Sequence, residues 1–349
     1  MPETAARLPK VVANEADLEA LLSRPSPALV NMMKRLDGDI MLLGVAGKIG
    51  PDLALTALKA IKKAGVDKKL IGVDLFPEEE SRALLENSGV ELIACDLLNP
   101  AEVAALPRAR NVIYLVGRKF GTQGNEELTW MINVVAPANA ARHFSESRIV
   151  AFSTGCVYPM VGPAGGGCVE TDQPGPLGEY AQSCLGRERV FEYYSKANST
   201  PVSLIRLNYA VDLRYGVLYD IGKLVLEGKP IDLTMGYFNA IWQGDVNNQT
   251  LLALEHCTSP PAIWNVTRPE VVSIRRVAEQ FAEIMGKRVE FTGEEGPVAL
   301  LSNSAKATKV FGPPTVLLEK LIHWQAHWLM AGGRSLNKPT HFEETGGEY

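Results

Sequence analysis

Short apolar runs alternate with amphipathic stretches between residues 40 and 206. A short apolar run predicts a buried strand, and apolar residues three or four positions apart predict a helix. Residues 51–64, for example, place Ala54, Leu58 and Ile61 on one helical face. Strands that are apolar throughout and separated by helices are typical of a doubly wound α/β fold, with a parallel sheet covered on both sides. The predicted strands are Ile40–Val45, Leu70–Asp74, Val90–Cys95, Val112–Val116, Ile149–Ser153 and Val202–Leu207.

The pattern is less regular on either side of this region. Residues 1–37 predict a polar N-terminal extension with one short helix near Glu15–Ser23, followed by two prolines. Residues 207–330 predict a smaller α/β lobe, partly interleaved with the first, and residues 331–349 predict a flexible tail. The later elements are expected near Gly216–Glu227, Ile231–Leu233, Val246–Glu255, Ile263–Val266, Ser273–Met285 and Val316–Leu329.

The composition is that of an ordinary globular protein. The 349 residues are 46% hydrophobic and 21% charged, with a formal net charge of −5. This balance gives no electrostatic reason to expect nucleic acid or an anionic membrane as a partner. The apolar runs are too short to span a bilayer, and the first residues lack the pattern of a secretory signal. We therefore expect a cytoplasmic protein.

The cysteines point the same way. There are five of them, an odd number, and no two have CxxC spacing. This usage argues against a disulfide framework and against a zinc site, so we expect no metal.

A glycine-rich turn joins the first predicted strand to the helix that follows. Gly44, Gly47 and Gly50 let the backbone turn sharply and approach a pyrophosphate, to which a helix N-terminus presents free N–H groups. The second strand ends in Asp74, 24 residues after Gly50, where a carboxylate can bind an adenosine ribose and repel a 2′-phosphate. These features predict a Rossmann domain over residues 38–206 that prefers NAD to NADP. Other expected cofactor contacts are Lys48, Ile49, Asp96 and Leu97.

Further segments occur in the order found in one enzyme family. They are Val112–Gly117 with Asn133 in the next helix, Phe152–Pro159, Glu170–Pro174, Tyr180 opening a helix, Arg206–Tyr209, Ile241–Val246 and Trp264–Val266. With the spacing GxxGxxG, this succession resembles the extended short-chain dehydrogenase/reductase family, which includes NAD-dependent sugar epimerases and dehydratases. The resemblance implies a Rossmann domain and a smaller C-terminal substrate lobe, with Val116, Gly117, Asn133 and Tyr180 near NAD. It also implies chemistry that begins by hydride transfer.

The resemblance assigns the proton transfer to two hydroxyls. Tyr180 matches a tyrosine whose phenolate takes a proton from a substrate hydroxyl while hydride moves to nicotinamide. Thr154 matches the hydroxyl that positions the same substrate oxygen, and Gly155 and Cys156 are expected beside the substrate. The alternative is structural: Thr154 caps a turn and Tyr180 is a packing residue.

The sequence departs from the family pattern YxxxK, in which the lysine binds the nicotinamide ribose and lowers the pKa of the tyrosine. That position is Cys184, which we interpret as a small packing residue rather than a nucleophile. The positive charge that the lysine would supply could come from Arg118 or Lys119. Alternatively, the positive charge of the oxidised nicotinamide could suffice to activate the tyrosine. The third possibility is that hydride transfer is lost and the protein only binds NAD. We favour Lys119, although both loop cations could equally be solvated. Arg187 lies about 10 Å along the helix axis from Tyr180, at 1.5 Å per residue.

Two further departures concern the substrate. Nucleotide-sugar enzymes of the family carry a diphosphate-binding arginine where this chain has Phe238. The acidic pair of the dehydratases is replaced by Gly155-Cys156. We therefore expect a free sugar, a sugar acid, a lactone or a glycoside, with Gly162–Gly167 either a lid or an ordinary loop. Candidate substrate contacts are Arg118, Lys119, Thr154, Gly155, Cys156, Arg206, Asn208 and Asn239.

The favoured function is thus an NAD-dependent oxidoreductase acting on a hydroxyl of a non-nucleotide carbohydrate. A sugar epimerase, including a nucleotide-sugar epimerase, uses the same hydroxyl chemistry and remains open. A non-catalytic NAD-binding regulator is the alternative from another class. Family resemblance further implies a homodimer, formed through the helices predicted at Gly124–Phe144 and Gly178–Ser195.

Overall fold

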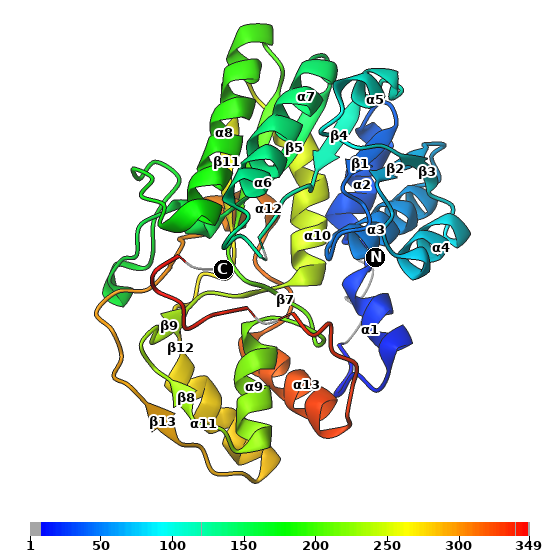
Figure 1. The fold of residues 1–349 in the computed structure, drawn as a ribbon. Coiled ribbons are helices and arrows are strands. Elements are labelled where there is room, and N and C mark those ends of the chain that lie inside the picture. Colours follow the sequence, from blue (N-terminus) through cyan, green and yellow to red (C-terminus); the bar gives the residue numbers. More distant parts are fainter. Residues whose placement is uncertain (1–7, 120, 339, 348–349) are drawn as a thin grey trace.

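The computed structural model describes residues 8–119, 121–338 and 340–347, which form two lobes (Figure 1). The larger lobe contains one sheet of seven parallel strands in the order β11-β6-β5-β4-β1-β2-β3. This arrangement confirms the predicted doubly wound α/β fold. The strands are β1 (Ile40–Leu43), β2 (Leu70–Asp74), β3 (Glu91–Ala94), β4 (Asn111–Tyr114), β5 (Arg148–Thr154), β6 (Val202–Leu207) and β11 (Ala262–Val266).

Both faces of the central strands of this sheet are buried, which explains why these strands are mainly apolar. Along β1, Ile40 and Leu42 enter one core, whereas Met41 and Leu43 enter the other. Successive side chains of a strand point to opposite faces, so each face receives every second residue. The covering helices are α2 (Pro27–Arg35), α3 (Gly50–Ala64) and α10 (Gln243–Leu252) on the first side and α5 (Pro100–Ala105), α7 (Ala136–His143) and α8 (Gly178–Asn198) on the second, with α4 (Glu79–Asn87) at the β3 end.

The helix predicted at Gly124–Phe144 is interrupted. It begins as α6 (Glu126–Trp130), continues through a π-helical turn at Met131–Val135 and then becomes α7. The wider turn contains Asn133, whose side chain is fully buried. π-helical turns of this kind are frequent at functional sites.

The N-terminal residues are part of the core. Helix α1 (Glu15–Leu22) was predicted, but α2 was not, because we interpreted the prolines near it as helix breakers. Pro27 instead occupies the first turn of α2, where a missing N–H costs nothing, and the Ser26 hydroxyl caps the helix by accepting from Leu29 N–H. Residues 1–7 of the predicted extension lie outside the described residues.

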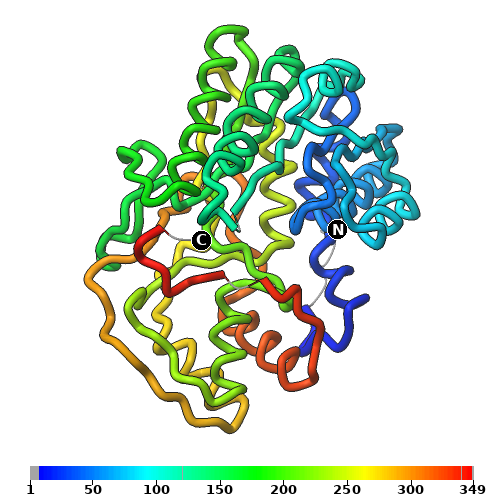
Figure 2. The backbone as a smooth tube through the Cα atoms, in the orientation of Figure 1, coloured from blue at the N-terminus to red at the C-terminus, as the bar shows by residue number. Residues whose placement is uncertain are grey.

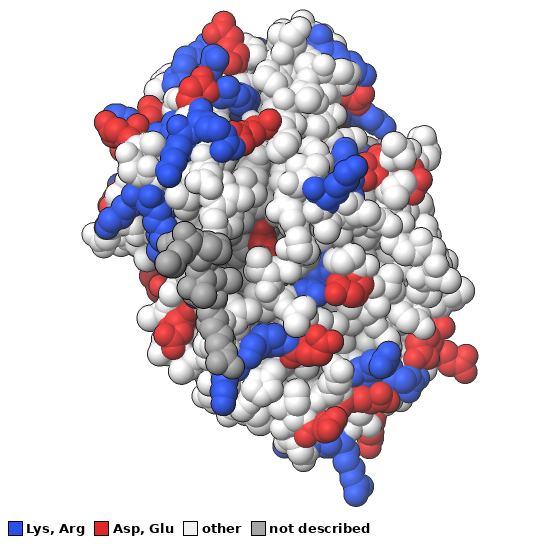
Figure 3. All heavy atoms as spheres, turned by 180° about the vertical axis from the view of Figure 1, so that it is seen from behind, with Lys and Arg blue, Asp and Glu red and all other residues white. Residues whose placement is uncertain are grey.

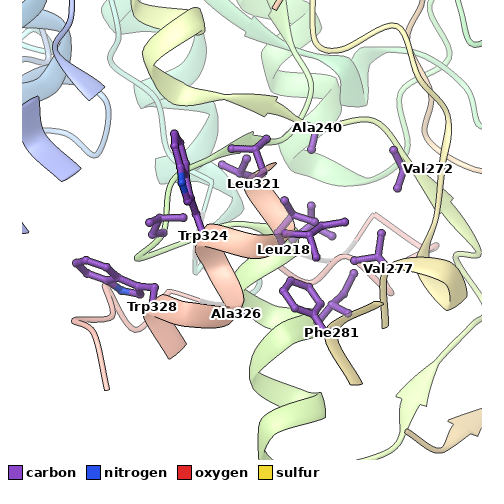
Figure 4. Close-up of a cluster of buried hydrophobic side chains, with 14 of the residues drawn as sticks. Leu218, Ala240, Val272, Val277, Phe281, Leu321, Trp324, Ala326 and Trp328 are labelled. Atoms are coloured by element: carbon purple, nitrogen blue, oxygen red, sulfur yellow. The ribbon is translucent and has the colours of Figure 1, made fainter. Parts of the chain in front are cut away.

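The smaller lobe has its own apolar core (Figure 4). Leu218 of α9, Phe281 of α11 and Trp324 of α13 meet there. Two elements that follow residue 206, α10 and β11, return to the larger lobe, and β11 pairs with β6. The remaining elements are β7 (Ala210–Val211), α9 (Val217–Glu227), β8 (Ile231–Asp232), β9 (Tyr237–Phe238), β10 (Ile241–Trp242), β12 (Val272–Ser273), α11 (Ile274–Met285), β13 (Phe291–Thr292), α12 (Ala305–Phe311) and α13 (Leu318–Met330).

The C-terminal segment differs from the mobile tail we expected. It crosses between the two lobes, as the red end of the tube shows (Figure 2). Thr340 is fully buried, and its backbone N–H and hydroxyl both donate to the Asp220 carboxylate. Gly347 packs against the start of α8, where a Cβ on Gly178 would lie 2.1 Å from the Gly347 carbonyl oxygen. Residues 339, 348 and 349 lie outside the described residues.

None of the described helices is long and apolar enough to cross a membrane. On the face opposite to that in Figure 1, acidic and basic side chains are intermixed (Figure 3). That face therefore carries no broad basic patch of the kind that binds nucleic acid.

Candidate active site

A cavity of about 280 Å³ lies beyond the carboxyl ends of β1, β4, β5 and β6. It includes the β1–β4 boundary, where the strand order reverses and where open α/β folds place their ligands. The lining joins the glycine loop to catalytic candidates from three later segments. Its residues are Gly44, Gly47, Lys48, Ile49, Gly50, Leu115, Gly117, Lys119, Phe152, Ser153, Thr154, Cys156, Tyr180, Arg187, Leu207, Asn208, Tyr209, Ala210, Tyr215 and Leu300.

The glycine loop has the close backbone approaches that the sequence predicted. Gly44 has φ of +88°, and a Cβ there would lie 2.7 Å from the Val116 side chain. A Cβ on Gly50 would lie 2.1 Å from the carbonyl oxygen of Val45, so neither position accepts a side chain without movement. The loop leads directly into the N-terminus of α3. This geometry fits a dinucleotide pyrophosphate.

Asp74 both fixes this loop and faces outward. Its Oδ2 accepts from Ala46 N–H at 2.9 Å and its Oδ1 accepts from Leu75 N–H at 2.7 Å. The side chain remains partly exposed at the end of β2. A carboxylate there can accept the hydroxyls of an adenosine ribose, which fits NAD.

Asp74→Ala is expected to weaken NAD binding by roughly 10- to 100-fold, because hydrogen bonds to a charged group contribute about 1.5–3 kcal/mol. Asp74→Asn is the matched control, since its amide oxygen can still accept from Ala46. Titration calorimetry with NAD and NADP measures the effect. Unchanged NAD affinity and unchanged preference over NADP in the alanine variant would contradict this role.

Other predicted cofactor residues divide into two groups. Lys48 and Ile49 line the cavity, and the Lys48 ammonium lies 3.6 Å from the centroid of the Tyr215 ring. Burial lowers the pKa of Lys48 to about 8. Asp96 caps its own turn by accepting from Leu98 N–H, and the Leu97 side chain packs into the core, so Leu97 offers a cofactor only its backbone.

The structure brings Thr154 and Tyr180 together. Thr154 ends β5, and its Oγ1 accepts from Cys156 N–H, so the predicted capping role is real. Tyr180 lies in the first turn of α8, and its side chain is hydrogen-bonded with that of Thr154. Burial raises the pKa of Tyr180, and the Cys184 and Cys156 thiols raise it further. The two hydroxyls thus share one end of the cavity.

Arg187 is the functional residue that sequence reasoning set aside. Its Nη1 donates to the Phe152 carbonyl oxygen at 2.9 Å, and its Nη2 donates to Asn133 Oδ1. The axial distance from Tyr180 was misleading because helical side chains lean toward the N-terminus, which carries a long guanidinium back over its own helix. Arg187 therefore reaches the cavity, and its charge lowers the pKa of Tyr180.

Cys184 fills the position of the family lysine as a packing residue. It is buried in a small apolar cluster with Tyr180 and Val157. Burial raises the pKa of the thiol to about 11, so it stays protonated at neutral pH and is a poor nucleophile.

Asn133 positions its neighbours instead of reaching a cofactor. Its Oδ1 accepts from Arg118 N–H and from Arg187, while its Nδ2 donates to the Arg118 carbonyl oxygen and to Ser183 Oγ. An amide has two acceptor lone pairs and two donors, so its capacity is used. We correct its predicted cofactor contact accordingly. Asn133 joins the Gly117–Lys119 loop to α8.

Only some of the residues predicted to contact the substrate line the cavity. Lys119, Cys156 and Asn208 line the cavity. Arg118 does not, and its Nη2 donates to the Gly121 carbonyl oxygen. Gly155 lies behind the lining, where a Cβ would be 3.1 Å from the Asn208 side chain.

Arg206 and Asn239 are structural, which corrects their assignment to the substrate. Arg206 is 2% exposed and forms two hydrogen bonds to the Glu188 carboxylate, at 2.9 and 2.7 Å, and one to the Tyr158 hydroxyl. Asn239 is fully buried and binds the backbone of Glu270 and of Ser302. Neither lines the cavity.

The loop Gly162–Gly167 is held at both ends. Bridges join Val161 to Ala299 and Cys168 to Ser302. Neither end lines the cavity. These contacts favour the ordinary-loop alternative over a lid.

Comparisons with known proteins agree with this architecture. Residues 40–210 match the model described as "NAD dependent epimerase/dehydratase family". The part of the chain that matches this family model is its Rossmann domain. Members are NAD-dependent enzymes, so the predicted family, enzyme class and cofactor are confirmed. No curated protein sequence matches the chain.

Solved structures of the same fold come from several bacteria, and the similarity to each covers 84% of this chain and 99% of the other. UDP-glucose 4-epimerase of Thermotoga maritima has 17% identity and a TM-score of 0.68. Pal from Bacillus thuringiensis has 18% identity and a TM-score of 0.69. UDP-glucuronic acid 4-epimerase of Bacillus cereus, in complex with UDP-glucuronic acid and NAD, has 19% identity and a TM-score of 0.67. At these identities the likeness concerns the fold.

Proposed function

We propose that this member of the family is an oxidoreductase acting on a hydroxyl of a small, non-nucleotide carbohydrate. The observation that carries the proposal is the hydrogen-bonded pair of Thr154 and Tyr180 in a cavity that also contains the glycine loop. When bound, NAD supplies the hydride acceptor. The Tyr180 phenolate takes the hydroxyl proton of the substrate, and the Thr154 hydroxyl holds the same oxygen in place.

The cavity supports a small substrate that carries negative charge or many hydroxyls. Lys119 and Asn208 line it together with three tyrosines, Tyr180, Tyr209 and Tyr215. An ammonium group and phenolic hydroxyls suit a sugar acid or a polyol.

In the described part of the smaller lobe, the position of the family's diphosphate-binding arginine carries no cation. Phe238, at the position of the diphosphate-binding arginine, is 1% exposed and packs edge-on against Tyr209 with ring centroids 6.5 Å apart. The Gly347 segment also lines a second small hollow next to the cavity, beside Leu177 and Met235. The alternative is a sugar epimerase, including a nucleotide-sugar epimerase, which the UDP-sugar 4-epimerases among the structures of similar fold favour.

Assays with NAD and a panel of sugars, aldonic acids, uronic acids and UDP-sugars test the proposal. We expect NADH to form only with non-nucleotide compounds. Chromatography of the products detects redox-neutral isomers. Isomerised UDP-sugar without NADH would support the epimerase instead, and NAD binding without any product would indicate a regulator.

Lys119 is proposed to bind the substrate. It is half-buried and lines the cavity, and burial lowers its pKa, with the neighbouring Cys156 and Cys184 acting in the opposite direction. Lys119→Met keeps much of the aliphatic volume and is expected to lower kcat/KM by roughly 10- to 100-fold, the loss of one charged hydrogen bond. Steady-state kinetics and NAD titration measure this effect. Unchanged kcat/KM, or an equal loss of NAD affinity, would contradict the assignment.

We also propose a homodimer formed through α6 and α8. Apolar side chains are exposed on this side of the molecule, at Leu128, Trp130 and Tyr193, and Met131 of the adjoining π-helical turn is also exposed. Covering such residues is a common reason for self-association.

A further inference from the structure

Arg187 is a buried cation that no described carboxylate neutralises. It is 5% exposed, and its hydrogen bonds go to neutral acceptors, the carbonyl oxygens of Phe152 and Asn133 and the Asn133 amide oxygen. Among the residues that the structure describes, no carboxylate lies within 4.0 Å of its guanidinium. The adjacent residue, Glu188, is committed to Arg206. Burying an unpaired charge is costly, so an anion formed or bound in the cavity would stabilise Arg187.

The candidate anion is on the same helix face. Tyr180, Cys184 and Arg187 are spaced i, i+4 and i+7, and Tyr180 and Arg187 both line the cavity. Two thiols also face Tyr180, Cys184 from α8 and Cys156 from the turn after β5, and Lys119 lines the cavity from the loop after β4. Among these groups, Tyr180 is the one that becomes an anion in the proposed reaction.

The surroundings make room for a guanidinium at this point. A Cβ on Gly117 would lie 2.5 Å from Arg187 Nη2, so this glycine allows the close approach. A lysine at position 184 would place a second cation beside Arg187, and like charges in a buried site repel strongly. Cys184 and Gly117 therefore form a consistent set with Arg187.

We propose that Arg187 is a positioning residue that stabilises the Tyr180 phenolate, supplying from i+7 the charge that the family lysine supplies from i+4. The expected effect of Arg187 on kcat/KM rests on the proposed function, whereas its expected effect on the titration of Tyr180 does not. The phenolate is stabilised by the guanidinium whether or not the right substrate is known.

The first test is a titration of tyrosinate by ultraviolet difference absorbance, without substrate or NAD. Subtracting the spectrum of Tyr180→Phe isolates the contribution of Tyr180. Arg187→Gln, which keeps polar contacts without charge, is expected to move this titration upward by roughly 1–3 pH units. Arg187→Lys should return most of the shift. Identical Tyr180 titration in the wild type and in Arg187→Gln would overturn the proposal, with circular dichroism confirming the fold at each pH.

The second test is the pH dependence of kcat/KM. In Arg187→Gln the rising limb should move to higher pH, so that activity near neutrality falls by roughly 10- to 1,000-fold and recovers in alkali. A purely structural role would lower activity at every pH, and in Arg187→Lys as well. Cys184→Ala, the matched control, removes the thiol but leaves the charge and should shift the limb less. If no compound is turned over but the tyrosinate titration shifts, the proposed function fails and the role of Arg187 stands.

Discussion

Tyr180→Phe is expected to lower kcat by roughly 10²- to 10⁴-fold, the usual contribution of a positioned general acid or base. The substitution removes one hydroxyl and keeps the ring that packs beside Val157 and Cys184. NAD affinity should therefore change little, which titration calorimetry can measure alongside the kinetics.

The pH dependence of the wild type provides a second readout. Burial raises the pKa of Tyr180 above its ordinary value, so the phenolate is a minor species at neutral pH, and kcat/KM should rise as the pH increases into the alkaline range. Tyr180→Phe should lose this limb along with turnover. Thr154→Val should also lower kcat, whereas Thr154→Ser should retain most activity. Substantial turnover in Tyr180→Phe with an unchanged pH profile would show that another group takes the proton.

The sheet could be predicted from the sequence because a strand buried on both faces appears there as a short apolar run. Strands β2 and β6 occur at the predicted residues, since most positions along them are apolar and buried. Helix α2 was missed because a proline reads as a breaker unless its place in the first turn is known. No sequence pattern predicts the π-helical turn at Met131–Val135. The turn accompanies the tertiary hydrogen bonds of Asn133, for example the one to Ser183 of α8.

The site was predicted in part, and its two arginines show where sequence reasoning stops. Arg206 lies near the carboxyl end of β6, where ligand-binding residues are common, yet Glu188 of α8 neutralises it. Arg187 looked remote along the helix axis, yet its side chain reaches the cavity. Adjacent residues, Arg187 and Glu188, thus face different partners, and no local pattern says which arginine the carboxylate will bind. The glycine loop and the Thr154–Tyr180 pair could be predicted because their assignment does not depend on knowing which side chains they contact.

The substrate lobe was the least predictable part, because the sequence does not show which partners its polar side chains bind. Asn239 was a candidate hydrogen-bonding contact of the substrate. Its amide instead satisfies backbone groups of Glu270 and Ser302, because irregular chain in a small lobe needs side chains to complete its hydrogen bonds. Asn208 of the same residue type does line the cavity, although its Nδ2 also donates to the Leu300 carbonyl oxygen.

Arg206→Met is expected to destabilise the protein by about 3–5 kcal/mol, because it leaves the Glu188 carboxylate buried without its cation. Glu188 is 2% exposed and would keep only the Ser153 hydroxyl as a side-chain donor. Chemical denaturation measures the free energy of unfolding. Arg206→Met combined with Glu188→Leu removes both charges and should recover much of the loss, since replacing a buried ion pair by apolar side chains is often neutral. The folded fraction of the single variant should keep its KM for substrate. An unchanged free energy of unfolding together with a raised KM would contradict the structural role of Arg206 and indicate that it contacts the substrate.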